Sequence, residues 1–181
     1  MLRWLMRRRI AAFERAFDYP MDYARDILEV SPRALFAYGR IAGLARYRRD
    51  VPPAAAYAAK LVAAKAEDCG PCTQLSVTMA EREGVAPAQL RAVLAGDEKA
   101  MNEEVALGFR FAQAVLAHDP GADTLREEVV RRWGRHALIS LAFAIAAVRV
   151  FPTVKYALGH GKACTRVTVG GSPMPVLRHA A

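Results

Sequence analysis

Apolar residues recur along most of this chain at spacings of three and four, the period of a helix with one buried face. The clearest case follows Asn102, a residue that favours the position just before a helix. The apolar positions there are Val105, Phe109, Ala112 and Leu116. The pattern therefore predicts an amphipathic helix that Asn102 caps and that reaches about residue 117.

Residues that start or stop helices divide the preceding part of the chain in the same way. Ser31 and Pro32 combine an N-cap with a favourable first helical residue. Gly84 and Gly96 are suited to the left-handed backbone that ends many helices. These signals predict helices over residues 32–46, 54–66, 73–83 and 87–94.

The second half of the chain predicts two further helices. Thr124-Leu-Arg-Glu127 has the form of a capping box, and that helix should end near Trp133-Gly134. A strongly apolar helix follows over His136 to Val150. Its longest apolar run, Ala137 to Val148, is interrupted only by Ser140 and is about half the ~20 residues that a bilayer requires. We therefore expect a buried core helix there and no membrane span.

The C-terminal part from Gly159 is rich in Gly and Pro, and little regular structure is expected in it. Its one alternating run, Thr165–Val169, is too short to indicate a sheet. The predicted fold is therefore all-α, a multi-helical bundle. We divide the chain into an N-terminal basic amphipathic arm (1–31), a helical domain (32–160) and a Gly- and Pro-containing C-terminal tail (161–181).

The N-terminal arm combines an apolar stripe with basic residues on the opposite face. The stripe consists of Trp4, Leu5, Ile10, Phe13 and Phe17. We expect the arm to be helical and to pack on protein at a subunit contact. Attachment to an anionic membrane surface is the alternative. The apolar faces of helices 32–46 and 137–148 also predict a homo-oligomer, because together they exceed what a small monomer need bury.

Composition and charge limit the classes of function that this chain can have. A length of 181 residues indicates one domain, and the 54% hydrophobic share comes mostly from Ala, Leu and Val. The net charge of +8 is concentrated in residues 1–50 and 151–181, which argues against a nucleic-acid-binding face. The N-terminus has no uninterrupted apolar core and no small-residue cleavage site, so we expect no secretory signal and a cytoplasmic protein.

The strongest chemical feature is Glu67-Asp68-Cys69-Gly70-Pro71-Cys72. Two thiols three residues apart can form a disulfide when the first lies at a helix N-terminus, a placement that Pro71 favours. Backbone N–H groups and the helix dipole then stabilise the thiolate of Cys69. We expect Cys69 to attack, Cys72 to resolve the mixed disulfide, and Glu67 to be a candidate for proton transfer.

Three other interpretations of these residues stay open. The cysteines could be small core residues, and Glu67 could be only a solvated acid. A zinc ion could be bound by four residues, namely Cys69, Cys72, His160 and Cys164. The remaining histidines, His118, His136 and His179, receive no chemical role.

The Cys69-x-x-Cys72 pair and the stretch from Met79 to Gly96, with Gly84-Val85 and Leu90 inside it, resemble the carboxymuconolactone decarboxylase-like superfamily, in its alkylhydroperoxidase D-type branch. The resemblance covers about residues 32–160. It implies an all-helical fold that assembles as homo-oligomers. It also implies a C-x-x-C centre that reduces peroxides or exchanges disulfides without a metal or an organic cofactor.

Active members of that branch carry a Glu twelve residues before the first Cys and a His four residues after the second. The matching positions here are Tyr57 and Ser76, neither of which is a base near pH 7. The leading hypothesis is a thiol-disulfide/peroxide oxidoreductase that acts on a peroxide or a protein disulfide. The alternative is a catalytically degenerate family member that is an oligomeric structural or small-molecule-binding protein. Lactone decarboxylation ranks third.

Overall fold

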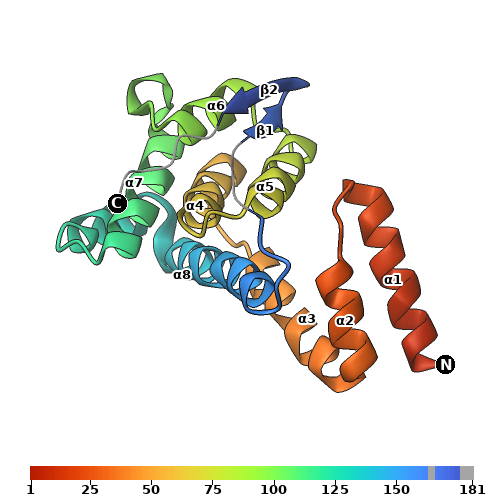
Figure 1. Ribbon diagram of the computed structural model, residues 1–181. Helices are drawn as coiled ribbons and strands as arrows, with labels where there is room; N and C mark the ends of the chain where they lie inside the picture. Colours follow the sequence, from red (N-terminus) through yellow and green to blue (C-terminus); the bar gives the residue numbers. More distant parts are fainter. Residues whose placement is uncertain (163–165, 176–181) are drawn as a thin grey trace.

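The computed structural model describes residues 1–162 and 166–175 and confirms the all-α, multi-helical prediction (Figure 1). Eight α-helices occur in these residues, with one short 3-10 helix, η1, and one hairpin of two strands. The helices are α1 (Leu2–Phe17), α2 (Asp22–Val30), α3 (Pro32–Arg46), α4 (Pro53–Ala66), α5 (Gly70–Arg82), α6 (Pro87–Ala95), α7 (Glu103–Ala117) and α8 (Ala122–Ala157). The other elements are η1 (Glu98–Ala100), β1 (Arg166–Val169) and β2 (Ser172–Pro175).

Helix α4 forms the centre of the molecule and packs against α5, α7 and α8. Its alanine-rich sequence presents small side chains on several faces, so neighbouring backbones approach closely. Gly108 of α7 lies directly against the backbone of Ala55 in α4, at a distance that leaves no room for a Cβ atom. One apolar cluster, with Leu61 and Phe109, lies toward α6 and the hairpin, and a second, with Leu141, lies toward α8.

Most predicted helix ends are confirmed. The Ser31 hydroxyl accepts a hydrogen bond from the Ala34 N–H group, and the Asn102 side chain accepts one from the Val105 N–H group at 2.9 Å. Gly84 and Gly96 have positive φ angles of 80° and 72° after α5 and α6. The local sequence therefore sets where these helices begin and end.

Helix α8 differs from its prediction at two points and agrees at one. The predicted break at Gly134 is confirmed by its non-helical φ of 82°. The capping box is wrong: the helix begins at Ala122, so Thr124 lies inside it and makes no cap. The helix also continues through Pro152 to Ala157, although a proline inside a helix removes a backbone donor and crowds the carbonyl four residues before it. The Thr153 hydroxyl bonds the Arg149 carbonyl in the same turn.

In length and composition α8 also resembles a membrane-spanning helix. About 44% of its most apolar stretch is buried inside the protein. The buried core helices of soluble proteins meet the same criterion, so this feature is weak support for a membrane location.

The tail contains regular structure that the sequence analysis did not predict. Strands β1 and β2 pair antiparallel, with Val167 opposite Met174, and the two-glycine turn between them has positive φ angles. The alternation in β1 buries Val167 and Val169 against the rest of the protein. The Gln74 side chain of α5 bonds both the N–H and the carbonyl of Thr168. A small hairpin therefore forms because α5 provides partners for it.

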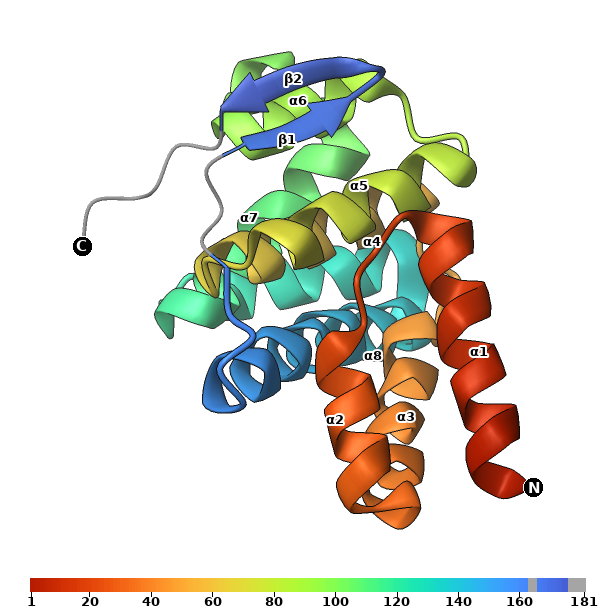
Figure 2. The same ribbon diagram turned by 45° about the vertical axis from the view of Figure 1, so that its right-hand side comes forward.

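The N-terminal arm packs on its own chain, at the end of the molecule opposite the hairpin (Figure 2). Helix α1 is confirmed, and it ends at Asp18 in the left-handed conformation. Ile10 and Tyr19 are buried in an aromatic cluster with α2, α3 and α5, whereas Trp4 and Leu5 are exposed. The part of the apolar stripe nearest the N-terminus thus faces outward, and the predicted subunit contact stays a prediction.

Candidate active site

Cys69 and Cys72 form a disulfide at the N-terminus of α5, with Cα atoms 5.3 Å apart. Cys69 is the N-cap of this helix, and its sulfur accepts a hydrogen bond from the Cys72 N–H group at 3.3 Å. Pro71 lies in the first turn, as predicted. The positive end of the helix dipole is therefore directed at the sulfur of Cys69, which favours its thiolate in the reduced protein.

The turn before the cysteines is fixed by backbone contacts. Asp68 has the left-handed conformation, with φ 47°, and its carbonyl accepts a hydrogen bond from the Tyr156 hydroxyl at 2.9 Å. The Gly70 N–H group donates to the carbonyl of Lys162, and Thr73 donates to the carbonyl of Cys69 from both its N–H and its hydroxyl. The C-terminal end of α8 therefore helps to position the disulfide.

Both sulfurs lie in the interior. Cys69 has no exposed surface and Cys72 is 6% exposed. The linker between α1 and α2 runs beside α5 in Figure 2, and it carries Tyr19 to the disulfide. Arg82 of α5 contacts the last turn of α1, just before this linker, by bonding the Ala16 carbonyl and lying over the Phe17 ring.

The Tyr19 hydroxyl lies 3.7 Å from the sulfur of Cys72. A disulfide sulfur carries no hydrogen, so the hydroxyl is the donor of this hydrogen bond. The Tyr19 oxygen in turn accepts a hydrogen bond from the ammonium of Lys155 at 3.1 Å. A chain of donors thus runs from α8 through the N-terminal arm to α5.

Lys155 is a buried lysine with 3% exposure, and among residues 1–162 and 166–175 it forms no ion pair with a carboxylate. Burial, and secondarily the charge of Lys162, lowers the pKa of Lys155 to about 8. The Tyr19 and Tyr23 rings, 4.9 and 5.4 Å away, stabilise the cation in part. Burial, and then the neighbouring Tyr23, raises the pKa of Tyr19 above its ordinary value.

Sequence reasoning missed both Tyr19 and Lys155. Tyr19 lies 53 residues from Cys72, and Lys155 lies 136 residues from Tyr19. One signal was present: Pro152 follows Val148 by four residues and Lys155 follows Pro152 by three, which places a lysine on the buried face of α8. That signal required the helix to continue past Pro152.

The residues singled out by sequence make other contacts. Glu67 is the C-cap residue of α4, and its carboxylate pairs with Arg149 at 2.5 Å. Its proton-transfer role stays a prediction. The Tyr57 hydroxyl donates to Glu83 at 2.6 Å. The Ser76 hydroxyl donates to the Cys72 carbonyl at 3.0 Å. Tyr57 and Ser76 occupy the positions where the resemblance leads us to expect a Glu and a His, and their hydroxyl hydrogens are engaged elsewhere.

Only three of the four residues in the zinc hypothesis belong to the part of the chain that the structure describes. The fourth, Cys164, lies outside it, and Cys69 and Cys72 are bonded to each other. His160 pairs with Asp26 at 2.6 Å. Within residues 1–162 and 166–175, no group of three or more His, Cys, Asp or Glu side chains is arranged to hold a metal ion.

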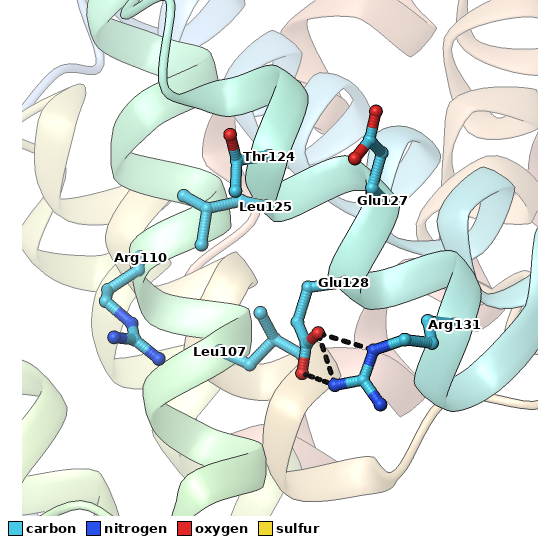
Figure 3. A pocket seen from close by; sticks show the side chains of 7 residues that line it. All are labelled: Leu107, Arg110, Thr124, Leu125, Glu127, Glu128 and Arg131. Atoms are coloured by element: carbon cyan, nitrogen blue, oxygen red, sulfur yellow. Dashed lines mark hydrogen bonds and ion pairs between the residues drawn. The ribbon is translucent and has the colours of Figure 1, made fainter.

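A shallow hollow lies between α7 and the first part of α8, away from the cysteines (Figure 3). It is lined by Leu107, Arg110, Thr124, Leu125, Glu127, Glu128 and Arg131. Glu128 and Arg131 bond each other one turn apart on α8, and these hydrogen bonds, with those from Arg132, lower the pKa of Glu128. Arg110 lies 4.0 Å from the carboxylate of Glu98. Three of the four charged side chains that line the hollow are thus paired, and we assign it no function.

Comparison with known proteins does not add a relative to this description. No protein-family model matches the chain, and neither the curated proteins nor the solved structures provide a match. The functional argument therefore depends on the residues around the disulfide.

Proposed function

We propose that the protein is a thiol-disulfide/peroxide oxidoreductase of the alkylhydroperoxidase D-like kind, with Cys69 and Cys72 as its redox pair. The observation that supports this most directly is the disulfide at the N-terminus of α5, where a backbone N–H group is directed at the Cys69 sulfur. A helix N-terminus lowers a thiol's pKa and makes it more reactive. The resemblance of residues 32–160 to that family agrees with this chemistry.

The reaction proceeds in two half-cycles. In the reduced protein, the Cys69 thiolate attacks a substrate disulfide, forms a mixed disulfide and releases one substrate thiolate. The Cys72 thiolate then attacks the Cys69 sulfur, closes the protein disulfide and releases the second thiolate. With a hydroperoxide, Cys69 becomes a sulfenic acid and an alcohol leaves; Cys72 then closes the disulfide and water leaves. A dithiol returns the pair to the reduced state and itself becomes a disulfide.

Trapping of the mixed disulfide tests this function. In a Cys164→Ser background, the reduced Cys72→Ser variant should form a stable adduct on Cys69 when offered the chromogenic disulfide dithionitrobenzoate. The matched Cys69→Ser variant should react far more slowly. Its remaining thiol, on Cys72, lies beyond the N-cap, where the helix N-terminus stabilises a thiolate less. Peptide mass spectrometry before and after reduction locates the adduct. Equal reactivity of the two variants would contradict the proposal, and so would the absence of an adduct on both.

One observation favours the alternative of a catalytically degenerate protein. Both sulfurs are buried, and the Tyr19 hydroxyl lies against that of Cys72, as in a purely structural disulfide. In that case dithiothreitol should reduce the disulfide only once the protein has unfolded. The rate of reduction should then equal the rate of global unfolding. Reduction that outpaces unfolding supports the redox function.

We also propose a cytoplasmic homo-oligomer. Helix α3 has no buried residue within the chain, and Phe36 and Leu44 on it are exposed. Ile139 and Phe143 of α8 are exposed as well. A second copy that covers these apolar side chains would remove them from water. Light scattering at micromolar concentration should therefore give a mass above that of the 19.8 kDa chain, and a monomer of that mass would refute this part of the proposal.

A further inference from the structure

The sulfur of Cys72 is the end of a chain of two hydrogen-bond donors. The Lys155 ammonium donates to the Tyr19 oxygen at 3.1 Å, and the Tyr19 hydroxyl lies 3.7 Å from the Cys72 sulfur. We propose that Lys155, acting through Tyr19, supplies and removes the proton of Cys72 each time the Cys69–Cys72 disulfide opens and closes. This inference rests on the proposed redox function and names the groups that replace the missing Glu and His of the family pattern.

The direction of the donors suits the opening step. When an external thiolate attacks the sulfur of Cys69, the sulfur–sulfur bond breaks and Cys72 leaves as a thiolate that carries the bonding electron pair. The Tyr19 hydroxyl passes its proton to this sulfur, and Lys155 restores the proton of Tyr19. Lys155 ends as a neutral amine, Cys72 ends as a thiol, and no charge remains on Tyr19.

The closing step is the reverse. The neutral amine of Lys155 accepts the proton of Tyr19, which accepts that of Cys72. The Cys72 thiolate then attacks the mixed disulfide on Cys69 and expels the substrate thiolate, which carries the electron pair. Tyr19 contacts the reacting sulfur and is the catalytic residue of this step, whereas Lys155 acts through it as a positioning residue.

The surroundings of Lys155 suit such an exchange. The groups that face it are Tyr19 and Tyr23 of the arm, Lys162 beyond the end of α8 and, through Tyr19, Cys72 of α5. The nearby Asp26 of α2 and His160 pair with each other. Because no carboxylate among the described residues neutralises Lys155, its charge is available to the thiolate. Its pKa of about 8 permits loss and gain of a proton near neutral pH.

A second tyrosine–lysine pair in this chain shows what a structural arrangement looks like. Lys60 lies over the ring of Tyr57 at 4.6 Å, and the Tyr57 hydroxyl donates to Glu83. The Glu83 carboxylate also pairs with Arg48 and stabilises the charge of Lys60. Beside Tyr19, the Cys72 sulfur takes the place that the Glu83 carboxylate has beside Tyr57. Among the described residues, no anion therefore balances the charge of Lys155 until Cys72 becomes a thiolate.

The two steps at the cysteines can be timed separately. Reduced protein with Cys164→Ser is mixed with dithionitrobenzoate, and attack by Cys69 releases one coloured thiolate while closure by Cys72 releases a second. Lys155→Met and Tyr19→Phe should slow the second release about tenfold at pH 7, because they remove the proton acceptor. The pH at which the second release becomes half-maximal should rise by about one unit, because burial without a nearby cation raises a thiol's pKa. The first release should keep its rate.

Three variants separate this role from a structural one. Lys155→Arg retains a cation that can donate to Tyr19, so it should restore the lower half-maximal pH. Because a guanidinium does not give up its proton in a protein, the second release should stay slow in this variant. Lys60→Met removes the comparison lysine, and Tyr38→Phe removes another buried hydroxyl of the aromatic cluster. Both should leave the second release as in the parent.

The outcomes distinguish the two proposals. Two releases with the same pH profile in the parent, Lys155→Met and Tyr19→Phe would overturn the relay and leave the redox function standing. Fewer than two releases from the parent would overturn the redox function itself. A raised half-maximal pH and a slower second release in Lys155→Met and Tyr19→Phe, with recovery of the half-maximal pH but not of the rate in Lys155→Arg, support the relay. Full recovery of the rate in Lys155→Arg would show that only the charge of Lys155 acts, and would overturn the proton transfer.

Discussion

Replacing Gly108 with alanine is expected to lower the free energy of unfolding by about 3 kcal/mol. An added Cβ atom at this position would overlap the carbonyl oxygen of Ala55 and would lie 2.9 Å from its carbonyl carbon. Both atoms belong to the backbone of α4, so no side chain can rotate away. Helix α7 would have to move off α4, which loosens the contact at the centre of both apolar clusters.

Gly39→Ala is the matched control for this prediction. Gly39 also lies within a helix, α3, but a Cβ atom there meets no atom within 4 Å among the described residues. Alanine should therefore raise stability by about 0.5–1 kcal/mol through its higher helix propensity. Urea denaturation followed by circular dichroism gives both values. A Gly108→Ala protein as stable as the parent would show that α4 and α7 are not packed this closely.

The helices of this protein were predictable because their signals are local. Ser31 and Asn102 bond N–H groups three residues away, and Gly96 and Gly134 need only their own left-handed backbone. Such features require no information about the rest of the fold. The same holds for Cys69 and Cys72, since the turn that brings the two sulfurs together is contained in four residues.

The hairpin could not be predicted in this way. Strand β2, Ser172–Pro175, contains two prolines and has no strand-forming pattern of its own. It forms because β1 pairs with it while Gln74 of α5 and Arg91 of α6 bond the backbone of β1. These partners lie 94 and 78 residues away along the chain.

The groups around Cys72 illustrate the same limit at the candidate site. Tyr19 was interpreted as part of an arm, and Lys155 lay beyond the predicted end of its helix. They meet at Cys72 because the linker after α1 and the last turn of α8 both pack beside the start of α5. Only the folded chain places the Lys155 ammonium and the Tyr19 hydroxyl near the Cys72 sulfur, because neither residue is close to Cys72 in the sequence.

Lys155→Met is expected to make the oxidised protein more stable at pH 7, by about 2 kcal/mol. The pKa of Lys155 is about 8 in the folded protein and about 10.5 when solvated, a difference that costs about 3 kcal/mol at any pH below 8. Methionine fills a similar volume without this cost. The loss of the hydrogen bond to Tyr19 offsets about 1 kcal/mol of the gain.

The gain should depend on pH in a defined way. Between pH 8 and about 10.5 the unfolded parent binds more protons than the folded parent, so the parent becomes more stable as pH rises through this range. The advantage of Lys155→Met should therefore be constant below pH 8 and decrease above it. Exposed Lys99 provides the control, because Lys99→Met should alter stability by the same small amount at every pH. Urea denaturation at a series of pH values measures both variants. A Lys155→Met protein that is less stable than the parent at pH 7 would show that the ammonium is a net stabilising group of the fold. The expected gain would show that the chain keeps a destabilising lysine beside its disulfide. Such a lysine agrees with a role in the proton transfer of Cys72.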